Sequence, residues 1–309
     1  MSDRWFEAVL ALMGKVASGE LTSEIGDPEL AARMARDLPQ PVDYVLPQCE
    51  VEDLLVDGTV RVRVYRRGES SGPLLVYCHG GGWIGGDLDM PEADALAREL
   101  VARIDVTVVS VDYRLCLNGV HFPAPLDDLE AAYRWALTTY GGQAAAVAVG
   151  GASAGSALAA ALPVRLRDAG EPLPDGTLLL YPAVHPELPE LDEETEAATR
   201  FLPAAPGFRP EVLQPLIENY LGGPWTEAPA EACAGLAPAE GLPSTFIINA
   251  EHDRLRASGQ RYAAQLEAAG VTVKQTCTPG VLHGHFNHPW LPETQKDLDA
   301  VAAWLTDLG

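Results

Sequence analysis

The segment Gly150-Gly151-Ala152-Ser153-Ala154-Gly155-Ser156 contains the serine with the strongest chemical signal in the chain. It follows a short apolar run at 145–149 and opens a small-residue segment that extends to about residue 166. A Gly-x-Ser-x-Gly pentapeptide between a strand and a helix is the pattern of a nucleophile elbow, a sharp turn that exposes the serine oxygen. The helix N-terminus would also favour negative charge developing near Ser153. A plain small-residue turn fits the pentapeptide equally well, so the rest of the chain must decide.

A glycine-rich loop, His79-Gly80-Gly81-Gly82-Trp83, follows an apolar run at 73–78. Three successive glycines can turn their N–H groups into one pocket, which suits an oxyanion hole. A phosphate-binding loop is disfavoured because no Gly-Lys-Ser/Thr follows the glycines, and a purely structural loop is the remaining alternative. We expect His79 to hold this loop by hydrogen bonds rather than act as a base, because it precedes the glycines.

Carboxylates follow another apolar run, at 244–249, in the segment Ala250-Glu251-His252-Asp253-Arg254-Leu255. Open α/β sheets place their sites at the carboxyl ends of their strands, where these acids would lie. We take Asp253 as the candidate orienting acid, with Glu251 in reserve. Either could instead cap a helix or form a surface ion pair.

The candidate base is His283, in the histidine-rich segment 279–288 after the last predicted strand. We prefer it to His285 because Gly284 follows it directly and leaves room around the ring. A competing interpretation is a metal site, since His283, His285 and His288 have the His-x-His-x-x-His spacing of metallo-hydrolases, with Asn287 where an aspartate is expected. Because no histidine follows His288, ligands for a second metal would be missing, and we rank this interpretation low.

Strand-like and helix-like segments alternate from residue 58 onward, which predicts a mostly parallel sheet covered by helices on both faces. Residues 59–65 alternate with the period of two that is typical of a strand. Further strand-like segments, of which 73–78 and 106–111 are apolar and β-branched, are 73–78, 106–111, 145–149, 177–181, 244–249 and 271–277. The helix-like segments are 91–104, 126–140, 153–167, 259–269 and 293–308.

Two regions fall outside this alternation. Residues 1–40 have apolar residues at helical spacing, and residues 186–242 are rich in Pro, Ala and Glu with a helix candidate at 211–220. A long insertion after a core strand is where α/β enzymes commonly carry a lid. We therefore predict a core of residues 41–185 and 243–309 and a helical cap of residues 1–40 and 186–242.

Composition excludes several classes of protein. The chain has 309 residues, with 44 acidic and 21 basic residues and a net charge of −23, which argues against binding nucleic acid or an anionic membrane. Its N-terminal segment lacks the pattern of a secretory signal, and no apolar run is as long as a membrane span. Five scattered cysteines without a Cys-x-x-Cys pair favour free thiols in a cytoplasmic protein.

Together these features closely resemble the bacterial hormone-sensitive-lipase-like esterases, family IV of the α/β-hydrolases. Order and spacing agree over about residues 60–308. The matching segments are His79–Gly82, Val111–Leu115, Phe122–Asp128, Gly151–Gly155, Asp253–Arg256 and His283–Gly284.

The resemblance implies an eight-stranded α/β-hydrolase sheet with a helical cap and a serine carboxylic-ester hydrolase activity. It assigns Ser153 as nucleophile, His283 as base and Asp253 as the acid that orients His283. The N–H groups of Gly81, Gly82 and Ala154 would form the oxyanion hole. No metal or organic cofactor is implied, the partner would be a small-molecule ester, and a homodimer is left open because related enzymes often dimerise.

The chain departs from the family pattern at several positions. The family usually has aspartate and glycine where Ala152 and Ser156 stand, and Ala-Pro-Glu where residues 116–118 read Cys-Leu-Asn. His285 occupies a position where phenylalanine is frequent, which would place a second imidazole near the base. We expect these departures to affect the substrate more than the fold.

The leading hypothesis is a hydrolase of small to medium carboxylic esters that forms an acyl-enzyme on Ser153. A tailoring enzyme on the same scaffold, such as a deacetylase, a lactonase or a non-covalent eliminase, is the alternative. A binding protein that kept the hydrolase fold is a more distant one, because binding does not require a complete triad.

Overall fold

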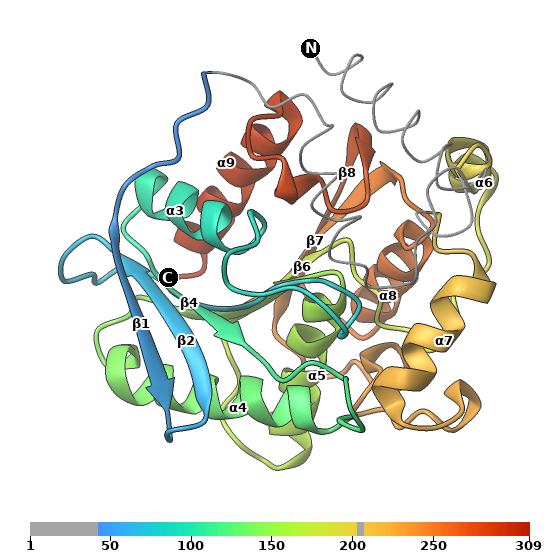
Figure 1. Cartoon of the computed structure of the whole chain (residues 1–309), viewed down its shortest axis with the longest axis horizontal. Coiled ribbons are helices and arrows are strands. Elements are labelled where there is room, and N and C mark those ends of the chain that lie inside the picture. Colours follow the sequence, from blue (N-terminus) through green and yellow to red (C-terminus); the bar gives the residue numbers. More distant parts are fainter. Residues whose placement is uncertain (1–42, 203–206) are drawn as a thin grey trace.

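A computed structural model describes residues 43–202 and 207–309, which form an eight-stranded sheet covered by helices on both faces (Figure 1). The strand order is β1-β2-β4-β3-β5-β6-β7-β8; β2 is antiparallel to both β1 and β4, and all other pairs are parallel. The strands are β1 Glu50–Val56, β2 Val60–Arg66, β3 Leu74–Cys78, β4 Thr107–Asp112, β5 Val147–Ala152, β6 Gly176–Leu180, β7 Ser244–His252 and β8 Val273–Leu282. The mostly parallel sheet predicted from the sequence is confirmed.

The first strand was missed by the sequence analysis, which placed the first strand at 59–65. β1 is an edge strand with one neighbour, and its residues Glu50, Glu52 and Asp53 are exposed. Apolar and polar residues do not alternate regularly along it, and two of its apolar residues, Val51 and Leu55, are exposed as well. Only Val56 of this strand is fully buried, and a strand that buries so little leaves little periodic signal.

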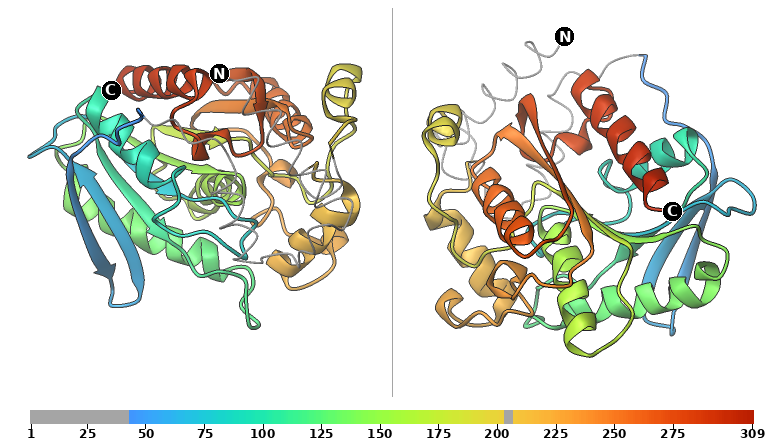
Figure 2. Two further views of the ribbon diagram at one scale, coloured as in Figure 1. Left: turned by 45° about the horizontal axis from the view of Figure 1, so that its top comes forward. Right: turned by 180° about the vertical axis from the view of Figure 1, so that it is seen from behind.

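The helices form two layers, one on each face of the sheet, as the views from the side and from behind show (Figure 2). One layer contains α3 (Asp94–Arg103) and α9 (Pro292–Asp307), and the other contains α4 (Ala124–Ala136), α5 (Ala154–Asp168) and α8 (Arg256–Ala268). The central strands are buried between the layers; in β3, Leu74, Val76 and Cys78 face one layer, and Leu75 and Tyr77 face the other. The predicted helix at 126–140 is α-helical to Ala136 and continues as a π turn, Leu137–Gly141.

The segment 186–242 contains helices and no strand among its described residues. It includes α6 (Glu193–Thr199), α7 (Pro210–Leu221) and two short 3-10 turns, Trp225–Glu227 and Ala234–Leu236. The buried face of α7 joins the core, where Tyr220 stacks on Trp83 at a ring-centroid distance of 4.4 Å. The other predicted cap region, residues 1–40, lies outside the described residues. No helix in the described ranges has the length and apolar character that crossing a membrane requires.

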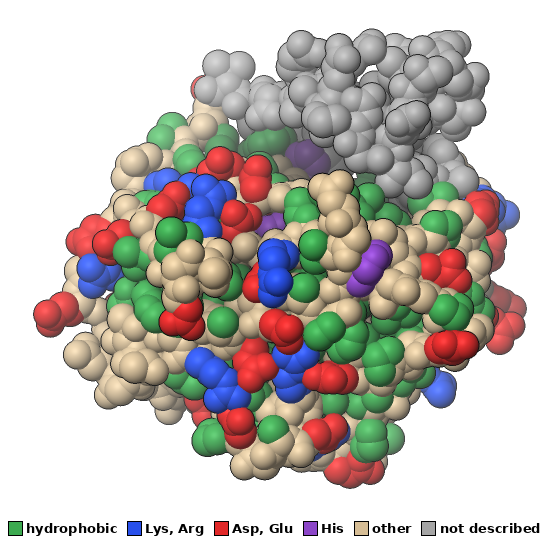
Figure 3. Space-filling model, turned by 60° about the horizontal axis from the view of Figure 1, so that its bottom comes forward, with side chains coloured by type: hydrophobic (Ala, Val, Ile, Leu, Met, Phe, Trp, Pro, Cys, Tyr) green, Lys and Arg blue, Asp and Glu red, His purple; other side chains and the backbone are tan. Residues whose placement is uncertain are grey.

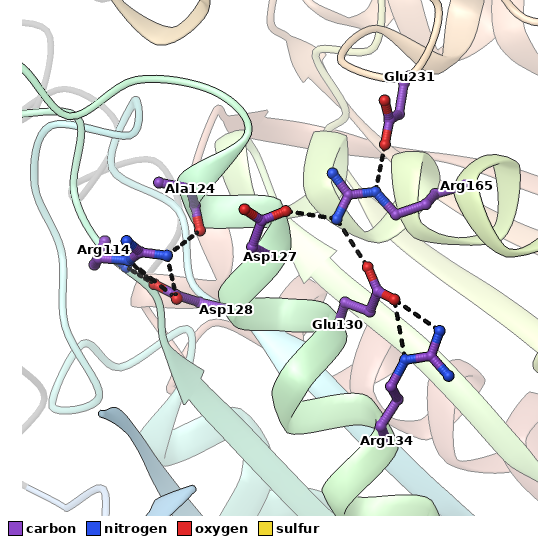
Figure 4. Close-up of polar contacts among 8 residues, drawn as sticks. All are labelled: Arg114, Ala124, Asp127, Asp128, Glu130, Arg134, Arg165 and Glu231. Carbon is purple, nitrogen blue, oxygen red and sulfur yellow. Dashed lines mark hydrogen bonds and ion pairs between the residues drawn. The ribbon is translucent and has the colours of Figure 1, made fainter. Parts of the chain in front are cut away.

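Arg165 on α5 connects this segment to the core (Figure 4). Its guanidinium lies 2.7 Å from Asp127 and 2.8 Å from Glu130, both on α4, and it also pairs with Glu231 of the segment 186–242. The Arg165 side chain is only 16% exposed. Acidic and basic side chains are likewise interspersed on the face that Figure 3 shows, so part of the large negative charge is compensated locally.

Replacing Arg165 with methionine should lower the free energy of unfolding by about 1–3 kcal/mol, because three carboxylates would lose the guanidinium that they share. Urea unfolding at neutral pH measures this loss. The matched control is Arg134→Met, since Arg134 pairs with Glu130 and Glu171 but its side chain is 48% exposed, and it should cost less than about 1 kcal/mol. Equal losses in the two variants would contradict the central role of Arg165.

Candidate active site

Ser153 lies in a strained turn between β5 and α5. Its φ of 52° and ψ of −117° place a non-glycine residue outside the regions that L-residues prefer. Its N–H donates to the Leu180 carbonyl at 2.9 Å, and its carbonyl accepts from the N–H groups of Ser156 and Ala157. These backbone bonds to β6 and within α5 hold the strained conformation in place.

The two glycines of the pentapeptide are required for close approach rather than for a left-handed backbone. A Cβ on Gly155 would collide with the carbonyl oxygens of Cys78 and His79, and a Cβ on Gly151 would collide with the Gly155 carbonyl. Neither glycine has a positive φ, and the residue with positive φ in this turn is the serine itself. The glycines therefore set how closely α5 packs on the end of β3.

Ser153, His283 and Asp253 form one hydrogen-bonded chain. The His283 Nε2 lies 2.9 Å from Ser153 Oγ, and its Nδ1 lies 2.6 Å from Asp253 Oδ2. Asp253 is fully buried, and its other oxygen accepts the N–H of Leu255 at 2.9 Å. An ionised carboxylate can only accept, so Nδ1 carries the proton and Nε2 is free to accept from the serine hydroxyl.

Glu251, the reserve acid, is not the carboxylate that bonds His283. Its carboxylate accepts the N–H of Gly280 at 2.6 Å, which fastens the end of β7 to β8. Of the two acids at the end of β7, the structure therefore brings Asp253 and not Glu251 to the histidine.

His285 pairs with a different carboxylate from His283, although it is only two residues away and both rings contact Tyr181. It is fully buried, with Nε2 2.8 Å from Asp297 of α9, and Asp297 also accepts from the Thr278 hydroxyl at 2.6 Å. Gly284, with φ of 76°, makes the turn that separates the two imidazoles. The His-x-His-x-x-His spacing thus directs His283 and His285 to different carboxylates. No group of three or more His, Cys, Asp or Glu is arranged for a metal within the described ranges.

The glycine loop after β3 lies beside the serine. Gly81 and Gly82 have φ of 112° and 62°, and the Gly81 carbonyl accepts from the N–H groups of Ile84 and Gly85. His79 holds the loop as expected, because its Nδ1 bonds the Gly80 carbonyl at 2.7 Å and its ring stacks on Tyr113. Burial lowers the pKa of His79, which keeps the ring neutral.

Ala154, the third predicted oxyanion-hole residue, is the first residue of α5. Its N–H therefore has no carbonyl partner one turn earlier in the helix and can serve a ligand. The loop glycines and the N-terminus of α5 thus approach Ser153 from adjoining elements.

A mostly apolar cavity of about 310 Å³ opens over Ser153 and His283. Phe208 and Leu216, from the segment 186–242, cover it, and the Phe208 ring lies edge-on to His283 at a centroid distance of 4.4 Å. The remaining lining residues are Gly81, Gly82, Ile84, Met90, Glu92, Gly284 and Asn287.

Three polar residues around this cavity were not identified from the sequence as site residues: Glu92, Tyr181 and Asn287. Glu92 bonds the backbone of the glycine loop and the side chains of the other two. Glu92 falls in a predicted helical segment and Tyr181 at the end of a predicted strand, positions that look structural in a single sequence. The one sequence signal for Glu92 as a site residue was an acid shortly after the glycine loop.

The departures from the family pattern have local structural consequences. The Ser156 hydroxyl donates to the Ser153 carbonyl at 2.5 Å, so it supports the turn from within α5. Cys116 connects two parts of the site, since its N–H donates to the Trp83 carbonyl at 2.6 Å and its carbonyl accepts from Asn219 of α7 at 2.8 Å. Ala152 is buried and places a methyl group where the family usually has a carboxylate.

Comparison with known proteins agrees with this geometry. A sequence model of a family described as alpha/beta hydrolase fold matches residues 75–287. The carboxylesterase NlhH of Mycobacterium tuberculosis is 37% identical over 272 residues, covering 84% of this chain and 82% of NlhH. A solved esterase from the bacterial hormone-sensitive lipase family has a TM-score of 0.77 at 25% identity, with 99% of both chains covered. The hyperthermophilic esterase from the archaeon Pyrobaculum calidifontis has a TM-score of 0.74 at 28% identity, covering 99% of this chain and 92% of that one.

Replacing Gly155 with alanine should lower the free energy of unfolding by about 3 kcal/mol, because the new methyl group would meet two backbone carbonyl oxygens that cannot move independently. Urea unfolding or a thermal melt measures this effect. Gly142→Ala is the matched control: no atom lies within 4 Å of its added Cβ and its φ is −67°, so its stability should change by less than about 0.5 kcal/mol. A similarly small change at Gly155 would show that the close approach is unimportant.

Proposed function

This chain belongs to the alpha/beta-hydrolase fold family, in its bacterial hormone-sensitive-lipase-like branch, and is a carboxylic-ester hydrolase; we propose that Ser153 is its nucleophile, His283 its base and Asp253 the acid that orients the base. The observation that carries this assignment is the continuous hydrogen-bonded chain from Ser153 Oγ through both His283 nitrogens to a fully buried carboxylate. A structural serine needs neither a base nor a buried acid behind that base.

In the proposed acylation step, the His283 Nε2 accepts the Ser153 proton as Oγ attacks the ester carbonyl carbon. Asp253 stabilises the imidazolium that forms and keeps the ring in the productive tautomer. The tetrahedral intermediate collapses when the carbonyl re-forms, the bond to the alcohol oxygen breaks and His283 donates its proton to that oxygen. The alcohol leaves, and the acyl group remains on Ser153.

The negative charge on the tetrahedral oxygen requires preorganised donors, and we assign the N–H groups of Gly81, Gly82 and Ala154 to this role. The positive φ values of the two glycines and the position of Ala154 at the start of α5 support the assignment. Donors fixed in a backbone cost little reorganisation during the reaction. Water then attacks the acyl-enzyme with His283 again as base, which releases the acid and restores Ser153.

The cavity supports small to medium esters as substrates. Its volume of about 310 Å³ lies at the lower end of the range for ligand pockets, and Ile84, Met90, Phe208 and Leu216 make its lining apolar. An amide or lactone substrate would use the same nucleophile, whereas an eliminase would use the base and oxyanion hole without acylating Ser153.

We also propose that residues 186–242, together with 1–40, act as a cap over a core formed by 41–185 and 243–309. Phe208 and Leu216 support this division, because both cover the cavity from outside the sheet. The five free cysteines, two of them accessible to some degree, favour a reducing cytoplasm, and we propose no nucleic-acid partner or stable membrane association. A homodimer is the one macromolecular partner that the family resemblance suggests.

Ser153→Ala should lower kcat for p-nitrophenyl butyrate by about 10⁴-fold or more, because the variant cannot form an acyl-enzyme. Intact-mass measurement should show one organophosphonate adduct on the natural protein and none on the variant. Ser156→Ala is the matched control, since its hydroxyl bonds the backbone of the same turn but does not face His283. Undiminished turnover in Ser153→Ala would refute the mechanism, and activity without adduct formation on the natural protein would favour the non-covalent alternative.

Leu216→Ala should shift the substrate preference of the enzyme toward esters with longer acyl chains. Both terminal methyl groups of Leu216 lie over Gly82 and limit the cavity. We expect the ratio of kcat/KM for p-nitrophenyl octanoate to kcat/KM for p-nitrophenyl butyrate to rise by about tenfold. The control is Leu236→Ala, in the same segment but 49% exposed and away from the cavity. An equal change for all chain lengths would argue against Leu216 as a boundary of the substrate site.

A further inference from the structure

A buried carboxylate, Glu92, lies between the two loops that carry the proposed oxyanion hole and the proposed base. It is only 2% exposed, yet it contributes to the lining of the cavity that contains Ser153 and His283. It comes from the connection between the glycine loop and α3. Of the described residues lining this cavity, it is the one carboxylate.

Three donors bind the Glu92 side chain. Its Oε1 accepts the N–H of Gly80 at 2.7 Å, and its Oε2 accepts the Tyr181 hydroxyl at 2.6 Å and the Asn287 side-chain amide at 3.0 Å. The Glu92 N–H in turn donates to the Asn287 side-chain oxygen at 3.2 Å. The backbone N–H and the side-chain amide can only donate, so Glu92 serves as an acceptor on both of its oxygens.

Each donor belongs to a different part of the proposed catalytic apparatus. Gly80 precedes Gly81 and Gly82 in the glycine loop. The Tyr181 ring lies edge-on to His283 at a centroid distance of 4.7 Å. Asn287 ends the short turn His285–Asn287 that follows His283 and Gly284, and its N–H bonds the Gly284 carbonyl at 2.9 Å.

We propose that Glu92 is a positioning residue for ester hydrolysis, which fixes the oxyanion loop relative to the His283 loop through Gly80, Tyr181 and Asn287. The proposal rests on the functions proposed above for Ser153, His283 and the loop glycines. Glu92 acts through these neighbours and needs no contact with the substrate.

The surroundings of Glu92 are shaped for a carboxylate. Burial and the nearby Glu92 charge hold the pKa of Tyr181 well above its ordinary value, so its hydroxyl stays protonated and donates. A Cβ on Gly80 would lie against Glu92 Oε1 and within 3.2 Å of Ser153 Cβ, which accounts for a glycine at position 80. Since position 152 is alanine, no acid next to the serine in sequence supplies this charge.

A positioning role for Glu92 predicts a different kinetic result from a role in stability alone. Misplacement of oxyanion donors by a fraction of an ångström weakens transition-state stabilisation while ground-state binding in an apolar cavity stays almost unchanged. The rate of the chemical step should therefore fall more than KM changes. A role confined to stability would lower the free energy of unfolding without a matching loss of kcat in the folded protein.

The test compares Glu92→Gln with Glu99→Gln in the full chain. Glu99 is a matched control because it is also buried, at 5% exposure, and it bonds Tyr44, Arg103 and Gln295, none of which lines the cavity. We expect Glu92→Gln to lower kcat for p-nitrophenyl butyrate by about 10- to 100-fold with KM within about threefold, and to slow organophosphonate labelling of Ser153 in parallel. Glu99→Gln should leave both rates within about twofold.

Tyr181→Phe provides a second measurement if Glu92→Gln folds poorly, because it removes one hydroxyl and retains the ring. It should lower kcat severalfold, and in the double variant with Glu92→Gln the two effects should be less than multiplicative, since both act through one hydrogen bond. Unchanged kcat and labelling in a folded Glu92→Gln variant, or in Tyr181→Phe, would overturn the positioning role. If the positioning role is overturned but Ser153→Ala is inactive, the proposed function still stands. If Ser153→Ala is active, the proposed function itself is refuted.

Discussion

The close contact between the start of α5 and the end of β3 is the constraint on which the rest of the site depends. Gly155 packs against the carbonyl oxygens of Cys78 and His79 at a distance that no side chain would permit. This contact brings the serine turn and the glycine loop together, although about 70 residues separate them in the sequence. The parallel pairing of β3 with β5 sets the register of both strands, so the sheet determines where each loop begins. Nucleophile and oxyanion donors are consequently positioned by backbone packing.

Much of the fold and of the candidate site could be predicted from the sequence, because the relevant signals are local. Buried parallel strands are continuous apolar runs, and Ser153 and Asp253 each follow such a run, whereas His283 follows the edge strand β8. The predicted strand and helix boundaries shifted by a few residues, which reflects the weak signal at element ends. The two candidate acids, Glu251 and Asp253, both followed the same strand, and the structure was needed to find which one meets His283.

What the sequence did not reveal depends on contacts between distant residues. β1 buries fully only Val56, and its identity as a strand comes from pairing with β2. Glu92, Tyr181 and Asn287 lie far apart in the sequence, and each has an ordinary structural explanation by itself. His285 was expected near the base, and both imidazoles do contact Tyr181, but the Nε2 of His285 pairs with Asp297 of α9 and not with the proposed triad. Hydrogen-bond partners of buried polar groups are a tertiary property that periodicity does not encode.

The loop at Cys116 couples the floor of the cavity to its cover. Its backbone bonds Trp83 in the glycine loop on one side and Asn219 of α7 on the other, while Trp83 itself stacks on Tyr220. The cover is thus not an independent module that could be exchanged between relatives at the ends of the segment 186–242. A chimaera would have to carry residues 116–118 together with α7. Substitutions in this loop during evolution would change substrate preference without altering any residue that touches the substrate.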